Sequence, residues 1–175
     1  MADLIVTLVG ADQPGIVESL AQPIAQHAGN WLESRMAHLA GKFAGILRIE
    51  VAPEKVRPLT EALAALERRG LKVVVEAGEP EPSPRPPQLM ELDLVGTDKP
   101  GIVREISRLL AARGVNIEEL VTDCPAAPMS GEALFRARAR VRLPDGVDLR
   151  ALRGDLEKVA SDLMVEVKLV GRERG

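Results

Sequence analysis

A short turn that occurs twice in the chain holds most of the residues whose types and spacing could do chemistry. It is formed by residues 10–17 (GADQPGIV) and by residues 96–103 (GTDKPGIV). The start of a helix has backbone amides that can bind a carboxylate, and an aspartate beside it can bind an ammonium group. Both groups are present in an amino acid, so the turn predicts a site for a small zwitterion.

Each residue type in the turn has an expected physical role. The first glycine allows an unusual φ or a close backbone approach where the chain leaves a strand. We expect the aspartate to cap the helix and the proline to lie in its first turn. The second glycine is expected to leave room beside the helix start. These residues are Gly10, Asp12, Pro14 and Gly15 in one copy, and Gly96, Asp98, Pro100 and Gly101 in the other.

An asparagine follows each turn at the same spacing. Asn30 and Asn116 open the next expected strand, and we expect their amides to lie beside the same edge of the sheet as the turn. A capped turn that binds no ligand would produce the same pattern, so both interpretations stay open from the residues alone.

The turn is part of a longer repeat with an offset of 86 residues. Seven of the nine positions of 9–17 (VGADQPGIV) are identical in 95–103 (VGTDKPGIV), and the same offset brings Asn30 onto Asn116. Alternating and amphipathic segments predict the order βαββαβ in each copy. The expected strands cover 3–9, 31–40, 43–52 and 71–77, and then 89–95, 116–123, 132–143 and 164–170.

Two right-handed crossovers and a hairpin arrange such a unit as one antiparallel sheet. The sequence therefore predicts an α+β fold of two ferredoxin-like domains, each with strand order 4-1-3-2 and both helices on one face. Residues 78–88 include five prolines, which fix φ and lack an amide hydrogen, so we expect a linker there. The expected domains are residues 1–77 and 89–171.

The D-x-P-G-I-V turn, the asparagine that opens the second strand and the βαββαβ order together resemble the ACT domain family, in both copies. The resemblance implies a non-enzymatic regulatory protein that binds a small amino acid, with glycine as one candidate. It also implies a role in transcriptional control of amino-acid metabolism through a regulatory protein partner. The ligand would lie between the turn of one module and the second-strand start of its neighbour. The implied site residues are Gly10, Ala11, Asp12, Pro14, Gly15, Ile16, Asn30, Gly96, Thr97, Asp98, Pro100, Gly101, Ile102 and Asn116.

The helix-free face of the second sheet is expected to carry a row of arginines. In residues 134–143 (LFRARARVRL), every second side chain points to that face. We expect Glu91, Asp93 and Glu166 to pair with the row, with an acidic protein or a nucleic acid as alternative partners. The row is Arg136, Arg138, Arg140 and Arg142, and Phe135, Ala137, Ala139, Val141 and Leu143 should lie beneath the helices.

The same face of the first sheet is expected to be apolar. An open apolar face of this size should be covered by the other copy of the module or by a second chain, so we expect a homodimer. The outward positions are Ile5, Thr7, Val9, Ile46, Arg48 and Val74.

The remaining residues argue against several other classes of protein. The formal charge of −3 and the 2% of aromatic residues disfavour direct nucleic-acid binding. Cys124 and the histidines, His27 and His38, have no metal-site or catalytic spacing. We therefore expect no cofactor and no metal site, and we interpret His38 as structural and Cys124 as incidental. Neither a signal peptide nor a membrane span is evident, so a cytoplasmic protein is expected.

Three functional hypotheses follow from the sequence. The first is the non-enzymatic amino-acid sensor. The second is a ligand-free module whose sheet faces only join protein chains. The third, an enzyme, is disfavoured because nothing assembles a nucleophile, a base and an orienting group.

Overall fold

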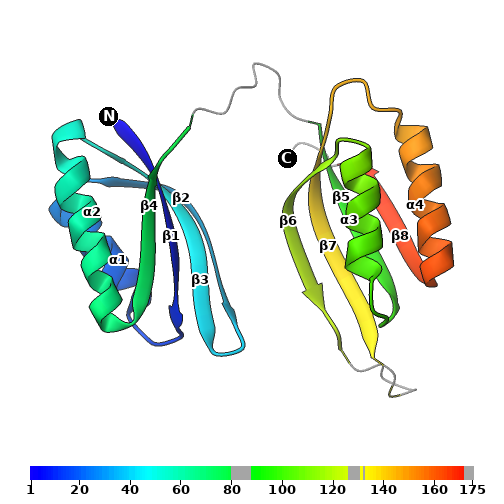
Figure 1. Ribbon diagram of the computed structural model, residues 1–175, viewed down its shortest axis with the longest axis horizontal. Helices are drawn as coiled ribbons and strands as arrows, with labels where there is room; N and C mark the ends of the chain where they lie inside the picture. The colour runs from blue at the N-terminus through cyan, green and yellow to red at the C-terminus, as the bar shows by residue number, and fades with distance from the viewer. Residues whose placement is uncertain (80–87, 126–130, 132, 172–175) are drawn as a thin grey trace. The chain divides into compact units, whose positions relative to one another are not determined.

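The computed structural model describes residues 1–79, 88–125, 131 and 133–171, which form two compact units. The first unit consists of β1 (Ala2–Ala11), α1 (Ile16–Gln26), β2 (Asn30–Leu39), β3 (Lys42–Val51), α2 (Val56–Ala64) and β4 (Leu71–Ala77), with short 3-10 helices at Pro53–Lys55 and Ala65–Arg69. The second consists of β5 (Gln88–Thr97), α3 (Ile102–Ala112), β6 (Asn116–Asp123), β7 (Leu134–Leu143), α4 (Leu149–Leu163) and β8 (Val165–Gly171) (Figure 1).

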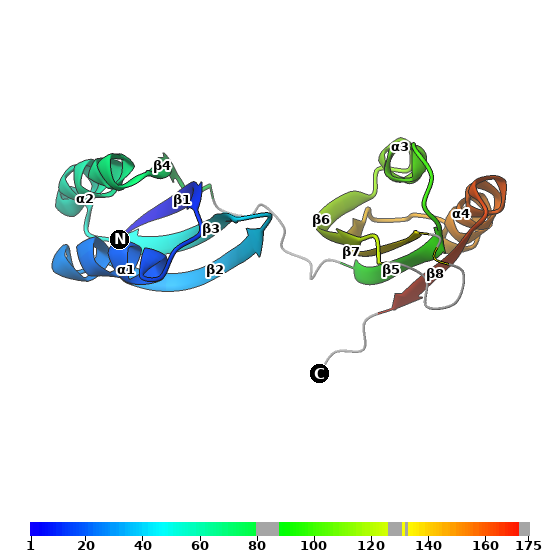
Figure 2. The same cartoon turned by 90° about the horizontal axis from the view of Figure 1, so that it is seen from below.

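Each unit is one four-stranded antiparallel sheet with two helices on one face. The strand orders are β2-β3-β1-β4 and β6-β7-β5-β8. Figure 2 shows α1 and α2 on one side of the first sheet, and α3 and α4 on one side of the second. The predicted α+β fold and the order 4-1-3-2 are therefore confirmed.

The core of each unit lies between its sheet and its helices. In β1 the alternate residues Leu4, Val6 and Leu8 are buried, and in β5 Met90, Leu92 and Leu94 are buried. The predicted inward row of β7, from Phe135 to Leu143, is also buried, so this part of the prediction is confirmed. Each of the two clusters of buried residues contains residues of one unit only.

The edge strands β2 and β6, each the second strand of its unit in chain order, contain a bulge. The register shifts between Trp31 and Glu33 in β2, and between Ile117 and Glu119 in β6. A bulge places one extra residue in the strand and changes the alternation of side chains around it. Simple alternation therefore does not assign the side chains of β2 and β6 to the two faces of their sheets.

Most of the expected linker, 80–87, lies outside the described residues. At its two ends the backbone belongs to the units, since the Gly78 amide donates to the Asp3 carbonyl oxygen at 2.8 Å and Gln88 pairs with Leu143. The strand of the second unit therefore begins one residue earlier than predicted. None of the helices in the described part of the chain is long and apolar enough to cross a membrane.

The arginine row on the second sheet is paired with carboxylates, but mostly not with those predicted. Arg138 bonds to Asp93 at 3.2 Å, as expected, while Glu91 only lies opposite Arg140 in the register. Glu166 lies opposite Val95 and away from the row, because β8 is on the far side of β5.

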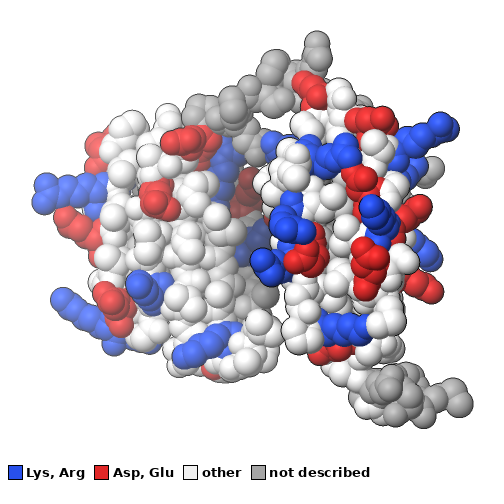
Figure 3. Space-filling model, turned by 45° about the vertical axis from the view of Figure 1, so that its right-hand side comes forward, with Lys and Arg blue, Asp and Glu red and all other residues white. Residues whose placement is uncertain are grey.

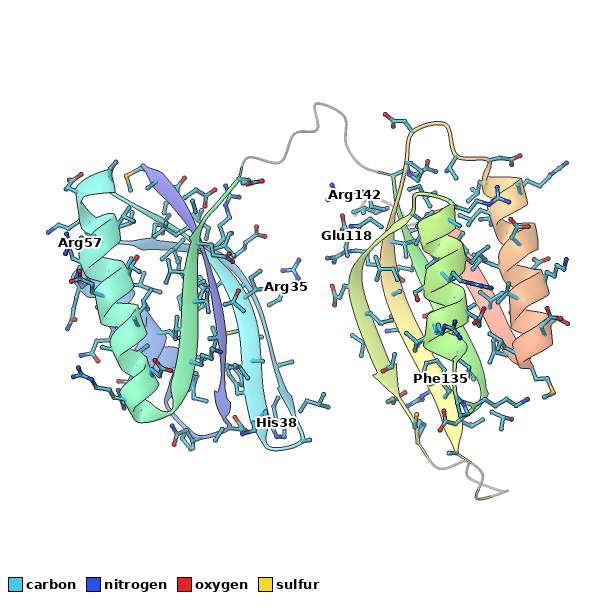
Figure 4. The ribbon with its side chains drawn as sticks, viewed as in Figure 1. Arg35, His38, Arg57, Glu118, Phe135 and Arg142 are labelled. Atoms are coloured by element: carbon cyan, nitrogen blue, oxygen red, sulfur yellow. The ribbon has the colours of Figure 1, made fainter. Side chains whose placement is uncertain are left out.

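The other partners of the row come from β6. Arg140 reaches Glu118 at 3.3 Å and Glu119 at 3.1 Å, because the bulge presents both carboxylates to it. Arg142 also bonds to Glu118, and Figure 4 shows these two side chains together.

Two aspartates on the outer faces form close ion pairs with arginines. Arg136 donates to Asp123, with Nη2–Oδ2 at 2.5 Å, and hydrogen bonds from this guanidinium lower the pKa of the Asp123 carboxyl. In the first unit Arg48 Nη2 lies 2.7 Å from Asp3 Oδ2, and it lowers the pKa of Asp3 in the same way. Both carboxylates therefore stay charged to a lower pH than an isolated aspartate.

Candidate ligand-binding site

Each repeated turn ends in a glycine with a left-handed backbone. Gly15 has φ 88° and Gly101 has φ 97°, and these residues are the N-caps of α1 and α3. The first helical hydrogen bonds run from the Ser19 amide to Gly15 O, 2.9 Å, and from the Glu105 amide to Gly101 O, 3.0 Å. The backbone amides of the three residues after each cap, 16–18 and 102–104, therefore have no acceptor within the helix. Neither N-cap residue makes a side-chain capping bond.

The prediction that Asp12 and Asp98 cap these helices is wrong. Each aspartate lies three residues before the cap, and the glycine takes the cap position instead. The Asp12 amide donates to Gly41 O at 2.9 Å and the Asp98 amide to Ala133 O at 3.0 Å, so both residues join the turn to the neighbouring hairpin. Their carboxylates are consequently not used by the helix.

The predicted position of the prolines is also wrong. Pro14 and Pro100 lie in the turn before the glycine cap, because the helices begin only at Ile16 and Ile102. These two isoleucines belong to the buried cores, with 6% and 1% of their surface exposed. Their backbone amides, rather than their side chains, are the groups that a ligand could reach.

The two glycines of each turn serve different purposes. A Cβ at Gly10 would lie 2.8 Å from Gly70 O, and one at Gly96 would lie 2.8 Å from Met164 O, which confirms the predicted close approach. A Cβ added at Gly15 or Gly101 would meet nothing within 4 Å, so the prediction that glycine is needed there to leave room is wrong. Their positive φ is the reason for glycine there.

A shallow hollow of about 280 Å³ lies against the first turn. Ala11 and Pro14 are exposed beside it. The predicted site did not include four of the lining residues, Gln13, Val17, Glu18 and Phe43, although Phe43 lies opposite Gly10 in the sheet register and so next to the turn. The hollow is lined by Asp12, Gln13, Gly15, Ile16, Val17, Glu18 and Phe43.

The asparagines lie at the opposite end of the sheet from the turn in their own unit. Because β1 and β2 both run antiparallel to β3, they point the same way, and Asn30 pairs with Glu50, which pairs with Asp3. Asp3 is about 26 Å along the strand from Ala11 at 3.3 Å per residue. Asn116 is placed equivalently, opposite Arg142 and near Leu89. The expectation of one shared edge within a unit is wrong, so turn and asparagine can meet only between modules.

The residue that does reach the first turn from β2 is His38. Its Nε2 lies 3.7 Å from Asp12 Oδ2 and accepts a hydrogen bond of 3.2 Å from the Gly41 amide. Figure 4 shows His38 at the end of the β2–β3 hairpin. The repeat offset places the exposed Cys124 at the equivalent position of the second unit.

The two turns differ in charge. Around the first turn lie Asp12 and Glu18, both acidic. In the second, the residues at the positions of Gln13 and Glu18 are Lys99 and Arg104. Arg104 is 80% exposed and its Nη1 is 3.8 Å from Glu105 Oε1. The second turn therefore presents more positive charge to a ligand than the first.

The fold and the turn together define a class of protein. Residues 2–76, most of the first unit, match the model of the ACT domain family. The second unit repeats its element order, its strand order and its turn.

Along most of its length the chain is also similar to a named regulator. The glycine cleavage system transcriptional repressor of Escherichia coli (strain K12) is 24% identical over 164 residues, which are 91% of this chain and 85% of that protein. Phosphoserine phosphatase SerB2 of Mycobacterium tuberculosis (strain ATCC 25618 / H37Rv) is 28% identical over 169 residues, but these are only 39% of the phosphatase.

Two solved structures share the fold over nearly the whole chain. A protein of unknown function from Galdieria sulphuraria has a TM-score of 0.88 at 28% identity, covering 98% of this chain and 99% of that one. A provisionally assigned glycine cleavage system transcriptional repressor has a TM-score of 0.73 at 20% identity, covering 99% and 98%. The second likeness concerns the fold alone.

Proposed function

We propose that this chain is a non-enzymatic regulatory protein that binds a small amino acid and modulates a partner protein. The observation that carries the proposal is the repeated turn, in which a helix begins at a left-handed glycine with no side-chain cap, beside a carboxylate that the helix does not use. Helix-start amides bind a ligand carboxylate, and the aspartate binds its ammonium group. The similarity to a glycine cleavage repressor supports a role in transcriptional control of amino-acid metabolism, with glycine as the first ligand to test.

The charges favour the second turn for the carboxylate of the ligand. At the start of α3, Lys99 and Arg104 attract a carboxylate and Glu105 offsets part of that attraction, whereas at the start of α1 Glu18 repels a carboxylate with no such cations beside it in the turn. Asp98 remains available for the ammonium group. In this proposal Asn116 or Asn30 contributes only from a neighbouring module, because neither lies at the turn of its own unit.

A protein partner fits the charges better than direct contact with DNA. The formal charge is −3, and each arginine of the row on the second sheet is paired with a carboxylate. Phosphate binding by such a row would require these pairs to be broken. We therefore propose that any effect on transcription is exerted through another protein.

Calorimetric titration of the full chain with each of the twenty amino acids tests the proposal. We expect heat from one or a few small amino acids, and about tenfold weaker binding after Asp98→Ala or Arg104→Glu, because each removes a charged contact. Arg57→Glu is the matched control, since Arg57 is 88% exposed on α2 and pairs only with its neighbour Glu61 among the contacts described. If none of the twenty amino acids gave a heat of binding, or if both turn variants bound normally, the proposed site would be refuted.

A second candidate function is a ligand-free interaction module. The observation that favours it is the exposed apolar outer face of the first sheet, where Val9, Ile46 and Val74 are each more than 40% exposed. A folded chain that binds none of the twenty amino acids yet still associates with itself or with a partner would favour this candidate.

A further inference from the structure

The outer face of the first sheet has an apolar centre that no helix covers. Thr7 of β1 lies between Val74 of β4 and Ile46 of β3 in the register, so these residues form one row across the strands. Val74 is 44% exposed and Ile46 47% exposed. In Figure 3 the first unit, on the left, presents a broad area without charged side chains. Apolar area of this kind gains free energy when water is removed from it.

Charged residues are arranged in opposite signs on either side of this row. On β4, Lys72 and Glu76 lie two residues before and two residues after Val74. On β3, Lys42 and Glu50 lie four residues before and four residues after Ile46. All four belong to the outer face, since they alternate with inward residues of their strands. A rotation of the face by 180° about an axis along the row would therefore exchange the positions of Lys72 and Glu76, and those of Lys42 and Glu50.

Side-chain size follows the same symmetry. The bulky ion-paired group of Asp3, Arg48 and Glu33 lies on one side of the row. The same rotation relates each of these three residues to an alanine, and it relates Ile5 to Val9. Asp3 is related to Ala11, Arg48 to Ala44 and Glu33 to Ala37. The face is thus complementary to itself in charge and in size.

We propose that this face is the interface between two copies of the chain, related by a two-fold axis that runs along the row Val74–Thr7–Ile46. Two sheets then pack face to face with their strands antiparallel, and the axis lies midway between them. Lys72 faces the partner subunit's Glu76, and Lys42 faces the partner subunit's Glu50. The row ends on the edge strand at Arg35, whose long side chain reaches solvent at the rim.

The outer face of the second sheet is a poor alternative cover for these apolar residues. At the positions of Thr7, Ile46 and Val74 it carries Asp93, Arg138 and Lys168. Burying such charges against valine and isoleucine costs more free energy than burying the same apolar groups against each other. An apolar partner is therefore favoured, and a second copy of the same face supplies one.

The size of the face predicts a dimer that dissociates on dilution. Four strands about 4.8 Å apart and seven residues at about 3.3 Å give a sheet area of roughly 450 Å² on each partner. Interfaces that bury less than about 1,200 Å² in total belong to the weaker, reversible class. The dimer should accordingly be measured over a wide range of concentration.

Sedimentation equilibrium of the full chain tests the proposal. We expect a reversible dimer whose dissociation constant rises by at least about tenfold in Val74→Asp and in Lys72→Glu, because each places charge against an apolar or a like-charged group. The double variant Lys72→Glu with Glu76→Lys exchanges the two signs and should restore the wild-type dissociation constant. Lys158→Glu, on the exposed surface of α4, makes the same change in net charge and should have no effect.

Three results would overturn the interface. The first is a protein that stays monomeric at every concentration. This includes a monomer in which another part of the same chain covers these apolar residues. The second is a dimer that ignores Val74→Asp and Lys72→Glu. The third is a double variant that dimerises no better than Lys72→Glu, because the charge complementarity would then be absent. None of these measurements depends on an amino-acid ligand, so the interface and the proposed function can fail separately.

Discussion

The residue that defines each turn is its second glycine. A left-handed backbone at Gly15 and Gly101 fixes where the helix begins and puts the glycine, not the aspartate, at the cap position. The identity of the motif was readable from the sequence, but its geometry was not. Asp-x-Pro-Gly is compatible with an aspartate cap or with a glycine cap, and only the backbone angles distinguish them.

Gly101→Ala should destabilise the second unit by about 1–2 kcal/mol, because an L-residue is strained in the left-handed region. Chemical denaturation monitored by circular dichroism measures this loss. Gly154→Ala is the control, since Gly154 lies inside α4 without a positive φ and with nothing within 4 Å of a Cβ. That substitution should stabilise the protein by about 0.5–1 kcal/mol. Equal effects of the two changes would contradict the role of φ.

The Asp123–Arg136 pair should make stability depend on acid pH. The pKa of Asp123 is lowered in the folded chain, so its stabilising contribution is complete above the ordinary aspartate pKa of about 3.9. It is lost as the pH falls through the lower, folded-state pKa. Asp123→Asn should reduce the free energy of unfolding at neutral pH, and its difference from wild type should vanish in acid. Urea unfolding at several pH values measures this, and a difference that persists in acid would contradict it. The exposed Asp162, changed to Asn, is the control.

At the scale of elements, most of the fold was predictable because it rests on periodicity. The alternation in β1, β5 and β7 assigned the inward residues correctly, and the repeat revealed the order of strands and helices twice. The pairing of the arginine row was not predictable, since a bulge in β6 turns Glu118 and Glu119 toward the same arginine. To place Asn30 and Asn116 correctly, the direction of each strand in the sheet had to be known as well as its residue range.

One core position differs between the two units and predicts a difference in packing. Leu47 of β3 and Ala139 of β7 occupy the same place, opposite Val6 and Leu92. A hollow of about 20 Å³ lies beside Ala139 under α3, lined almost entirely by apolar side chains. The smaller side chain of alanine leaves this space unfilled.

Ala139→Val should therefore stabilise the second unit by about 0.5 kcal/mol, at about 24 cal/mol per Å³ of cavity filled. Leu47→Ala makes the reverse change in the first unit and should cost about 2–5 kcal/mol. Urea unfolding measures both. A loss of stability in Ala139→Val would mean that the space closes in solution and that the added methyl groups overpack it.

At the scale of the whole molecule, we propose that residues 1–78 and 88–171 are separate domains, one residue longer at each side of the linker than predicted. The support is that each core is built from one unit alone, and that the same architecture is complete twice. The sequence pointed to this organisation through its prolines and its repeat. It contained no signal for the bond between Gly78 and Asp3 that extends the first unit past its last strand.

Reciprocal core substitutions test this proposal. Leu59→Ala should weaken hydrogen-exchange protection across β1–β4 and leave β5–β8 unchanged, because Leu59 is fully buried in the first core. Leu152→Ala, fully buried in the second core, should have the opposite distribution. Loss of protection throughout the chain from either change would show that the two units unfold as one.

The bulges in the edge strands β2 and β6 have a consequence for aggregation. An edge strand offers a row of unpaired amides and carbonyls to which strands of other molecules can add, and such addition leads to fibrils and precipitates. The interruptions at Trp31–Glu33 and Ile117–Glu119 break the regular spacing of that row. Open-ended strand addition at these two edges is thereby discouraged, whereas the proposed face-to-face dimer does not use them.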